Sequence, residues 1–457
     1  MYKLSRYVTT SRTAASSGSD PVLAYSARTG QTMRLSTSLW DQLATNQFDR
    51  LTLNDFQRLK ESGIIVPSIE DEFRSVLNEN ANASMTYSTL FLVVQPTASC
   101  QLSCSYCGQT HSKRRLTDET IKSIVARADE KLKTKRYTQL EIGWFGAEPL
   151  NALPQIRKVG AELRSLCGYY DVAFLGRIIT NGLAFTSAAA ADLLQIGVIR
   201  AEITLDGPDE IHDNRRGTKS GKGTFHRILD NIISVLDNHR DKISVSIRCN
   251  VDSSNVHGVH ELILELHRRG LHNRIASLYF APVHIWGTAG ADQALTASAF
   301  AALQVEWFLK MLALGYKVDL IPKRTTIACM VFKPDSELYD AFGNVYNCTE
   351  VSHVEAYNIR NGDSSTTTNK YAIGAVDNHI RSDDLPFTNF YDEVSSGAYQ
   401  CSKCQIFPVC GGKCPKSWQE GNIPCPPEKF NLPQRLIIKD LISNRATKIV
   451  GAHKAVT

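Results

Sequence analysis

The chain has 457 residues, more than one ordinary core holds, and its 43% hydrophobic and 21% charged composition excludes a disordered or fibrous protein. Its net charge of +5 is spread along the chain, and its short basic runs are typical of solvated helix faces, so nothing favours nucleic acid. No apolar run is long enough to span a membrane, and residues 1–18 lack the hydrophobic region of a signal peptide. We therefore expect a cytoplasmic protein with neither a nucleic-acid nor a membrane partner.

Residues 1–85 contain no cysteine and predict a small domain of strands and helices. The segment 21–36 reads as a hairpin of two strands around Thr29-Gly30. Two short helices follow, over 37–45 and from 51 to about 63. Strands followed by small helices favour a winged-helix-like module.

From residue 86 to 290, strand-like and helical patterns alternate. Apolar runs of strand length lie at 89–96, 140–146, 172–180, 200–207, 243–252 and 275–283. Amphipathic helical patterns separate them, at 117–133, 153–166, 187–195, 223–238 and 255–270. This order predicts an α/β fold with a parallel sheet, and right-handed crossovers curl it into a partial (β/α)6 barrel. The chemistry of such a barrel lies just past the strand ends.

The rest of the chain divides into three parts. Residues 291–328 predict a helical bridge, and residues 431–457 a C-terminal helix. Between them, residues 329–430 hold seven cysteines but little periodic apolar pattern. In a reducing compartment we expect these thiols to be metal ligands rather than disulfides, and metal sites to hold this segment together.

Three cysteines follow the first predicted barrel strand, as Cys100-x3-Cys104-x2-Cys107. Soft thiolates select iron–sulfur clusters, zinc or copper. A cubane cluster has four irons, so three cysteines leave one iron open to an exogenous ligand. The alternatives are three unrelated thiols, or zinc with a distant fourth ligand.

The stretch "CQLSCSYC" resembles the cluster loop of radical S-adenosylmethionine (SAM) enzymes. The resemblance implies a [4Fe–4S] cluster whose open iron chelates S-adenosylmethionine, electron transfer to which yields a 5′-deoxyadenosyl radical. It implies that Tyr106 packs against adenine. Further motifs at the strand ends resemble the same family, and they imply a cofactor-binding set of Gly146, Ala147, Glu148, Pro149, Thr180, Asn181, Thr204, Asp206, Arg216 and Asn250.

The resemblance also implies individual roles, which fit the chemistry of each side chain. "GAEP" has Ala147 where the family motif has glycine, and Glu148 with nearby carbonyls suits the methionine ammonium. Arg216 suits its carboxylate by a bidentate contact. Thr204 suits the ribose or the carboxylate, and Asn250 the nucleoside. Asp206 is equally well explained as a turn former.

The cysteines of residues 329–430 resemble those of the SPASM extension, so the resemblance covers roughly residues 88–430. It implies two auxiliary iron–sulfur clusters, an outer one on Cys401, Cys404, Cys410 and Cys425 and an inner one on Cys329, Cys348 and Cys414. The inner cluster then has an open iron, or uses Asp335, Glu337 or a residue elsewhere. A zinc-ribbon-like site is the alternative, because the same spacings suit zinc.

Two cysteines remain, Cys167 in a helix and Cys249 at the end of the fifth barrel strand. Both are expected to be structural. If Cys249 points into the barrel, however, it is a candidate catalytic residue that donates a hydrogen atom to a substrate radical.

The SPASM resemblance implies a peptide substrate. The N-terminal module resembles the winged-helix element that binds leader peptides by adding a strand to a sheet edge; a packing domain is the alternative. We therefore predict a radical SAM maturase that installs an intramolecular crosslink, carbon–carbon or thioether and cyclophane-like, in a ribosomally made precursor peptide with a leader. An external electron donor such as flavodoxin or ferredoxin is expected. Peptide epimerisation, sulfatase-maturing-type oxidation and a non-catalytic metal-binding scaffold are the alternatives.

Overall fold

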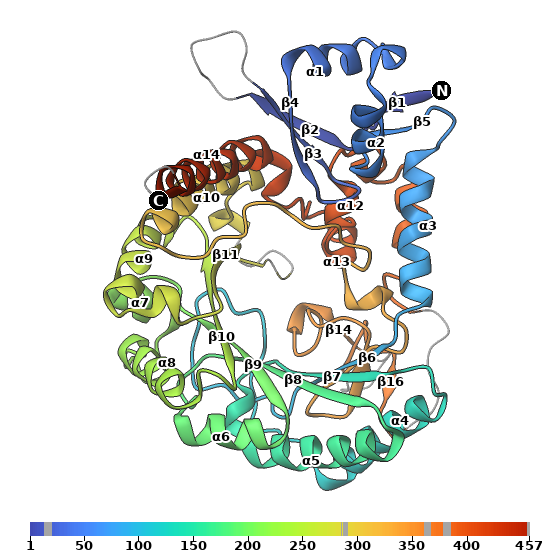
Figure 1. Ribbon diagram of the computed structural model, residues 1–457. Helices are drawn as coiled ribbons and strands as arrows, with labels where there is room; N and C mark the ends of the chain where they lie inside the picture. The colour runs from blue at the N-terminus through green and yellow to red at the C-terminus, as the bar shows by residue number, and fades with distance from the viewer. Residues whose placement is uncertain (13–20, 285, 287–290, 361–366, 378–384, 455–457) are drawn as a thin grey trace.

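The computed structural model describes residues 1–12, 21–284, 286, 291–360, 367–377 and 385–454 (Figure 1). At its centre is a nine-stranded sheet of order β11-β10-β9-β8-β7-β6-β12-β13-β16. The run from β6 to β11 is parallel throughout, and it comprises β6 (Thr89–Val94), β7 (Gln139–Trp144), β8 (Ala173–Thr180), β9 (Val198–Thr204), β10 (Ser244–Val251) and β11 (Ser277–Pro282). The predicted α/β partial barrel is confirmed.

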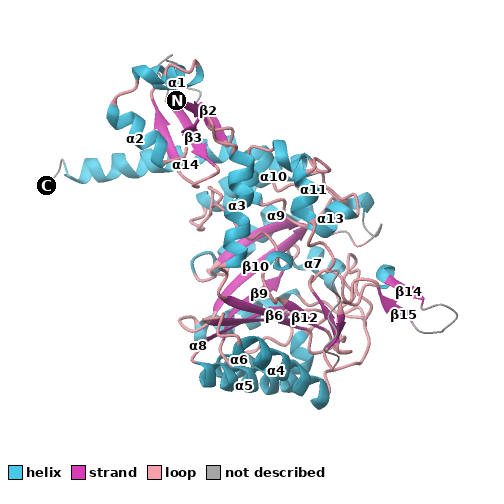
Figure 2. Cartoon of the chain, turned by 90° about the vertical axis from the view of Figure 1, so that its right-hand side faces the viewer, coloured by secondary structure: helices cyan, strands magenta, loops and turns pink. Residues whose placement is uncertain are grey.

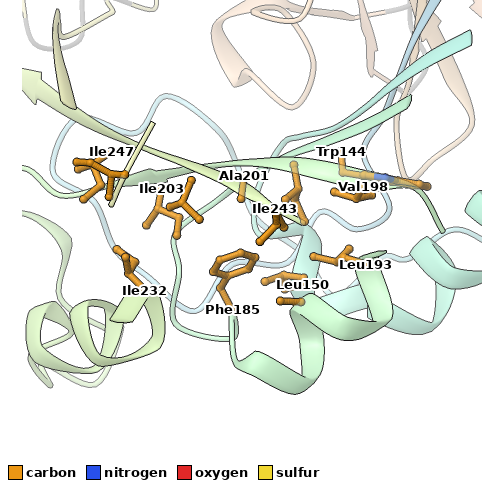
Figure 3. Packing of buried hydrophobic residues seen from close by; sticks show 14 of the residues in the cluster. Trp144, Leu150, Phe185, Leu193, Val198, Ala201, Ile203, Ile232, Ile243 and Ile247 are labelled. Atoms are coloured by element: carbon orange, nitrogen blue, oxygen red, sulfur yellow. The ribbon is translucent and has the colours of Figure 1, made fainter. Parts of the chain in front are cut away.

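Helices pack along the outside of this curved sheet (Figure 1). They are α4 (Asp118–Lys133), α5 (Leu153–Tyr170), α6 (Ser187–Gln195), α7 (Asp209–Arg216), α8 (Phe225–His239) and α9 (Val259–Arg268). In α8, Ile228, Ile232 and Val235 recur at helical spacing and are fully buried. Each such side chain contributes about 1.5–3 kcal/mol by leaving water. Figure 3 shows Ile232 below Ile203 and Ile247 of the neighbouring strands.

The strands of the barrel present two different faces. In β10, Val245, Ile247 and Val251 pack into the main core, while Arg248 and Asn250 line an interior pocket. This alternation follows from the two-residue period of a strand. It separates an apolar helix-facing side from a polar interior.

The cysteine-rich segment continues the barrel sheet. Strand β12 (Glu337–Tyr339) pairs in parallel with β6, and β13 (Asn344–Tyr346) and β16 (Gly374–Ala375) extend the sheet by antiparallel pairs. The buried Glu337 forms ion pairs with Arg127 at 2.8 Å and Lys131 at 3.0 Å, both on α4. The sheet therefore crosses from the barrel into the region that was expected to be a separate domain.

The remaining elements of the second half are two long helices, α10 (Ala297–Ala313) and α14 (Glu428–Lys454), and several short helices and strands. The short elements are β14 (Asn358–Arg360), β15 (Thr367–Asn369), α11 (Phe390–Ser395), α12 (Phe407–Cys410) and α13 (Pro415–Gln419). The expected domain boundary at residue 290 and residues 455–457 of the expected last helix lie outside the described residues. No helix among the described residues is long and apolar enough to cross a membrane.

The N-terminal module is built on a three-stranded antiparallel sheet, β2 (Val8–Arg12), β3 (Val22–Ser26) and β4 (Thr32–Leu35). Its other elements are β1 (Tyr2–Leu4) paired with β5 (Ile65–Pro67), and the helices α1 (Thr37–Ala44), α2 (Leu53–Glu61) and α3 (Glu72–Met85). Gly30 has a φ of +72° in the β3–β4 turn, a conformation that favours glycine. Helix α14 lies against this sheet (Figure 2), where Lys439 Nζ donates to Thr32 Oγ1 at 3.0 Å.

Candidate active site

The three-cysteine loop, residues 98–116, is clamped by backbone hydrogen bonds. Its two ends join where Ala98 N donates to Arg114 O at 3.0 Å. Its middle is attached to the end of α7, because Ser105 N donates to Arg215 O at 3.0 Å and Ser103 N to the Gly217 carbonyl at 3.0 Å. The protein itself therefore sets the shape of this loop.

Burial raises the pKa of all three thiols, whereas a nearby arginine acts in the opposite direction on Cys104 and Cys107. Cys100 and Cys104 are half-buried and Cys107 is exposed. Burial raises the pKa of the Cys100 thiol to about 11. Burial also raises the pKa of Cys104, while the nearby Arg216 lowers it. A cluster would bind thiolates, and Arg216 supplies the positive charge that such a site needs.

Tyr106 connects the loop to the ends of two barrel strands. Its hydroxyl donates to Asp206 Oδ2 at 2.5 Å and accepts from Asn250 Nδ2 at 3.0 Å and from Arg216. The fully buried Asp206 also accepts from the backbone N–H of Asn250 at 2.8 Å. The structure thus brings together four residues of the expected set, and Asp206 does more than form a turn.

Arg216 carries a donor without a protein partner. Its guanidinium is 3.6 Å from Asp206 Oδ2, and its buried Nε has no hydrogen-bond partner among the described residues. A buried unpaired donor is costly unless a ligand satisfies it. This arrangement fits the carboxylate of a bound amino acid.

Its neighbour Arg215 was not anticipated from the sequence. Arg215 NH1 contacts both carboxylate oxygens of Asp252, at 2.8 and 3.0 Å, and its guanidinium lies 5.1 Å from the centre of the Tyr106 ring. This buried ion pair fixes the Tyr106 ring from one side. The Arg-Arg dipeptide was the one signal of this contact in the sequence, because the carboxylate that pairs with Arg215 lies 37 residues further along the chain.

Glu148 has a different role from the expected one. Its buried carboxylate accepts from Thr180 Oγ1 at 2.7 Å, from Asn181 N at 2.7 Å and from Leu150 N at 2.9 Å. These protein donors occupy the carboxylate that was expected to suit an ammonium. Glu148 therefore ties the ends of β7 and β8 together.

The backbone of the same motif is tightly constrained. Gly146 has a φ of +82°, and a Cβ there would lie 2.4 Å from the amide nitrogen of Gln95. Ala147 also has a positive φ, of +44°, and its N–H donates to Gln109 Oε1 at 3.0 Å. Pro149 is buried and opens a short 3-10 turn. The motif is held as a sharp turn whose backbone faces the three-cysteine loop.

The two remaining polar positions of the set lie close by. Asn181 Nδ2 is 3.9 Å from Cys100 Sγ, a distance at which an amide can donate to sulfur. Thr204 lines the interior pocket together with Tyr106 and Asn250. Both positions therefore face the space where the expected cofactor would lie.

A second layer of contacts holds α7 and α8 behind the site. Buried His212 accepts from Asp206 N at 3.2 Å through Nδ1, and its Nε2 lies 3.1 Å from Thr224 Oγ1. Asp213 accepts from the N–H of Thr224 at 2.7 Å, and a Cβ at Gly223 would lie 2.1 Å from that carboxylate. Residues 223–225 thus pack behind the site, and through His212 they help to position Asp206.

The interior pocket has a volume of about 260 Å³. Tyr106, Thr204 and Asn250 form one side of it. Four charged side chains also line it, namely Arg177, Glu202, Arg248 and Glu350, and burial lowers the pKa of the neighbouring His284. A substrate that reaches the site would meet these charges.

The expectation of a reactive Cys249 is not supported. Cys249 is fully buried in the main core with Ile247 and Val251, on the helix-facing side of β10. The alternation of the strand turns it away from the pocket that Asn250 lines. Cys167 is likewise buried in the core on α5.

The four cysteines of the expected outer set line one small cavity. Cys401, Cys404, Cys410 and Cys425 share it with Trp418, and Lys429 Nζ is 3.4 Å from Cys425 Sγ. This convergence fits a single thiolate-ligated group. Among the described residues, no three His, Cys, Asp or Glu side chains are arranged to hold a single metal ion.

For the inner set the support is electrostatic: the charges of Cys329 and Cys414 contribute to raising the pKa of Cys348. Burial is the main reason that the pKa of Cys348 is raised. Neither carboxylate considered as a fourth ligand is free: Glu337 pairs with α4, and Asp335 accepts from Tyr137 OH at 2.6 Å. The backbone N–H of Glu350 is 3.5 Å from Cys348 Sγ, and the Glu350 carboxylate contributes to raising the pKa of Cys329 and Cys348.

Comparisons with known proteins agree with this geometry. Residues 94–266 match the sequence model of the radical SAM superfamily. An uncharacterized protein of Synechocystis is 27% identical over 148 residues, 30% of this chain and 35% of that protein. The serine-type anaerobic sulfatase-maturating enzyme of Bacteroides thetaiotaomicron is 26% identical over 153 residues, 31% of this chain and 36% of the enzyme. The matches thus span about a third of these curated relatives.

Solved structures show the same fold. Native anSMEcpe with bound AdoMet has a TM-score of 0.53 at 18% identity, covering 77% of this chain and 100% of that one. The same protein with AdoMet and the Cp18Cys peptide has a TM-score of 0.54 at 17% identity, covering 78% and 99%.

Proposed function

Residues 94–266 are a radical SAM domain, and from that premise we propose that this protein uses S-adenosylmethionine to modify a peptide. The observation that carries the proposal is the contact of Tyr106, Asp206, Arg216 and Asn250 beside the three-cysteine loop. When bound, a [4Fe–4S] cluster and S-adenosylmethionine supply a 5′-deoxyadenosyl radical. Cys100, Cys104 and Cys107 would hold the cluster.

The protein's own residues bind and orient the cofactor. The unpaired Nε of Arg216 is available to a carboxylate, and the hydroxyl of Tyr106 is fixed by Asp206, which orients the ring. Thr204 and Asn250 lie where a ribose or base could be bound. The backbone at Gly146 and Ala147, rather than the Glu148 carboxylate, is left for the ammonium.

The C-terminal cysteines support two auxiliary iron–sulfur clusters. The cavity shared by Cys401, Cys404, Cys410 and Cys425 supports the outer one. Cys329, Cys348 and Cys414 would hold the inner one, with Glu350 as the nearby carboxylate. An external electron donor such as flavodoxin or ferredoxin completes the proposal, because cofactor cleavage consumes an electron.

The product we propose is an intramolecular crosslink in a precursor peptide. Joining two side chains removes two hydrogens and leaves an electron that auxiliary clusters could accept. The sulfatase-maturating relative and the peptide-bound neighbour support a peptide substrate, and the N-terminal sheet could receive a leader. Epimerisation has less support, because Cys249 lies on the helix-facing side.

The test is anaerobic incubation of reconstituted protein with reductant, S-adenosylmethionine and the peptide encoded by a short reading frame beside the gene, in heavy water. A product two hydrogens lighter, with fragmentation that locates a ring, is expected. One incorporated deuterium without other change in composition would show epimerisation instead. Absence of 5′-deoxyadenosine, from protein loaded with iron and sulfide, would refute the enzyme assignment.

A further inference from the structure

A groove of about 890 Å³ runs beside β11, outside the interior pocket. Every residue from Ala276 to His284 lines it on one side. Residues 422–428 of the cysteine-rich segment line the other side, and among them Ile423 is 60% exposed. Leu278, Phe280, Phe300 and Phe308 add further apolar lining, and a concave, mostly apolar surface of this size is typical of a binding site.

Strand β11 is the open end of the nine-stranded sheet. Among the described strands it pairs with β10 alone. Ala276 N donates to Val245 O at 2.8 Å, so the N–H groups that alternate with it, those of Ser277, Tyr279 and Ala281, point to the open side. The groove therefore contains a row of backbone donors and acceptors, which is what an extended peptide pairs with.

The groove is continuous with the interior pocket. Arg248, His284 and Glu350 line both, so a chain lying in the groove leads directly to the pocket that Tyr106 and Asn250 line.

At its other end the groove leads towards the N-terminal module. Lys413, Glu428 and Arg435 line both the groove and a further cavity of about 320 Å³. Pro322 forms a wall of that cavity, and its carbonyl accepts from Tyr25 OH of β3 at 2.9 Å. The three cavities thus adjoin one another in a row between the N-terminal sheet and the interior.

We propose that an extended segment of the peptide substrate binds in this groove as an added strand on the free edge of β11. The identity of the occupant as substrate rests on the proposed function. Backbone pairing with β11 supplies affinity without a sequence requirement, and Ile423 covers one face of the added strand. A bound chain would then enter the interior pocket past Arg248 and Glu350.

The test uses 15-residue random peptides, displayed on mRNA and selected on the full-length, cluster-loaded protein. Selected peptides are labelled and titrated against three proteins: wild type, Ile423→Asp, and the matched control Ile359→Asp. Ile359 is also an exposed isoleucine, 51% accessible, and it lies on β14 outside the groove. We expect affinity to fall at least about tenfold in Ile423→Asp, as for loss of about 1.4 kcal/mol, and less than about twofold in the control.

Hydrogen exchange distinguishes an added strand from apolar contact alone. In the complex, exchange should slow across residues 276–283 and stay unchanged at β16, the opposite edge of the same sheet. The proposal would be overturned if the selected peptides bound Ile423→Asp and Ile359→Asp with equal affinity, or if hydrogen exchange at 276–283 did not change. It would also be overturned if the selection returned no binding peptide. Cofactor cleavage and peptide mass are measured separately: peptides that bind the groove of a protein inert toward S-adenosylmethionine would refute the proposed function alone.

Discussion

The two cysteine regions of this protein are held in different ways. The three-cysteine loop is fastened by backbone hydrogen bonds to itself and to the end of α7, and it follows a six-residue buried strand. The segment from Cys329 to Cys425 instead contains strands of two or three residues, such as β12 and β16. In the first region the protein itself sets the geometry, whereas in the second the clusters that we propose would contribute to stability.

This difference means that loss of a ligand should have opposite consequences in the two regions. Where backbone hydrogen bonds fix the geometry, removing a thiol should abolish activity but leave the fold intact. Where metal binding supplies folding energy, removing a thiol removes structure.

The largest expected effect is on activity, in Cys104→Ala. Formation of 5′-deoxyadenosine should fall to background, because the three-thiolate set is incomplete. The melting temperature should stay within about 2 °C of wild type, since backbone hydrogen bonds hold the loop. Chromatographic assay of 5′-deoxyadenosine and calorimetry check the two parts, and a large drop in melting temperature would break the contrast between the regions.

The next effect is on stability, in Cys404→Ala. A structural site that loses a ligand should cost roughly 3 kcal/mol or more and lower the melting temperature by about 6–12 °C for a domain of this size. Cys167→Ala, in the core but outside both sets, is the control. Limited proteolysis should cut the variant within residues 329–425; equal resistance to wild type would show that the short strands suffice.

A smaller effect is expected on cofactor affinity, in Arg216→Lys. Lysine keeps the charge but loses the planar pair of donors, so the dissociation constant for S-adenosylmethionine should rise about 10- to 100-fold. Equilibrium dialysis on cluster-loaded protein measures it, with the exposed Arg269→Lys as control. An unchanged constant would place the carboxylate elsewhere.

Glu148→Gln tests whether Glu148 stabilises the protein by joining the ends of β7 and β8 or instead binds the ammonium group of the cofactor. In the variant, the side-chain NH2 group of glutamine would point at backbone N–H groups from which the carboxylate now accepts hydrogen bonds. The loss of these hydrogen bonds should lower the free energy of unfolding by about 1–3 kcal/mol. Urea denaturation of both proteins without cofactor measures the loss. Unchanged stability together with weaker cofactor binding would restore the ammonium role that the sequence suggested.

The smallest effect is a pH dependence from His212. Burial, with Arg216 and Arg215 nearby, holds the pKa of this imidazole well below its ordinary value near 6.5. Below that value the unfolded chain binds a proton that the folded chain does not, so stability falls as pH decreases, by up to about 1.4 kcal/mol per pH unit. His212→Gln should flatten the profile of unfolding free energy between pH 6.5 and 5, and a profile as steep as that of wild type would contradict this.

The barrel was predicted well because the periodic spacing of apolar residues is a strong signal for strands and helices. Each of the parallel strands β6 to β11 lies within a few residues of its expected run. Helix α7 escaped prediction because its eight residues, Asp209–Arg216, carry almost no apolar side chain. Its stability comes from tertiary contacts of His212 and Arg215, which sequence period cannot reveal.

The candidate site shows the same limit. Motif positions such as Tyr106, Arg216 and Asn250 were predicted and do meet in space. The hydrogen-bond donors that contact Glu148 could not be predicted, because a carboxylate accepts equally well from an ammonium group and from a backbone N–H. Strand β12 was missed because three residues carry too little pattern to identify a strand.

The pairing of β12 with β6 has a consequence for synthesis of the chain. Strand β6 is made early, yet one of its two hydrogen-bonding edges is completed only when residues 337–339 arrive. At ordinary translation rates that is roughly 240 residues, on the order of 10–50 s, later. During that interval the nascent barrel exposes an apolar, unpaired edge directly beside the loop of Cys100. The ribosome-bound chain therefore passes through a period in which this edge is open to pairing with other strands.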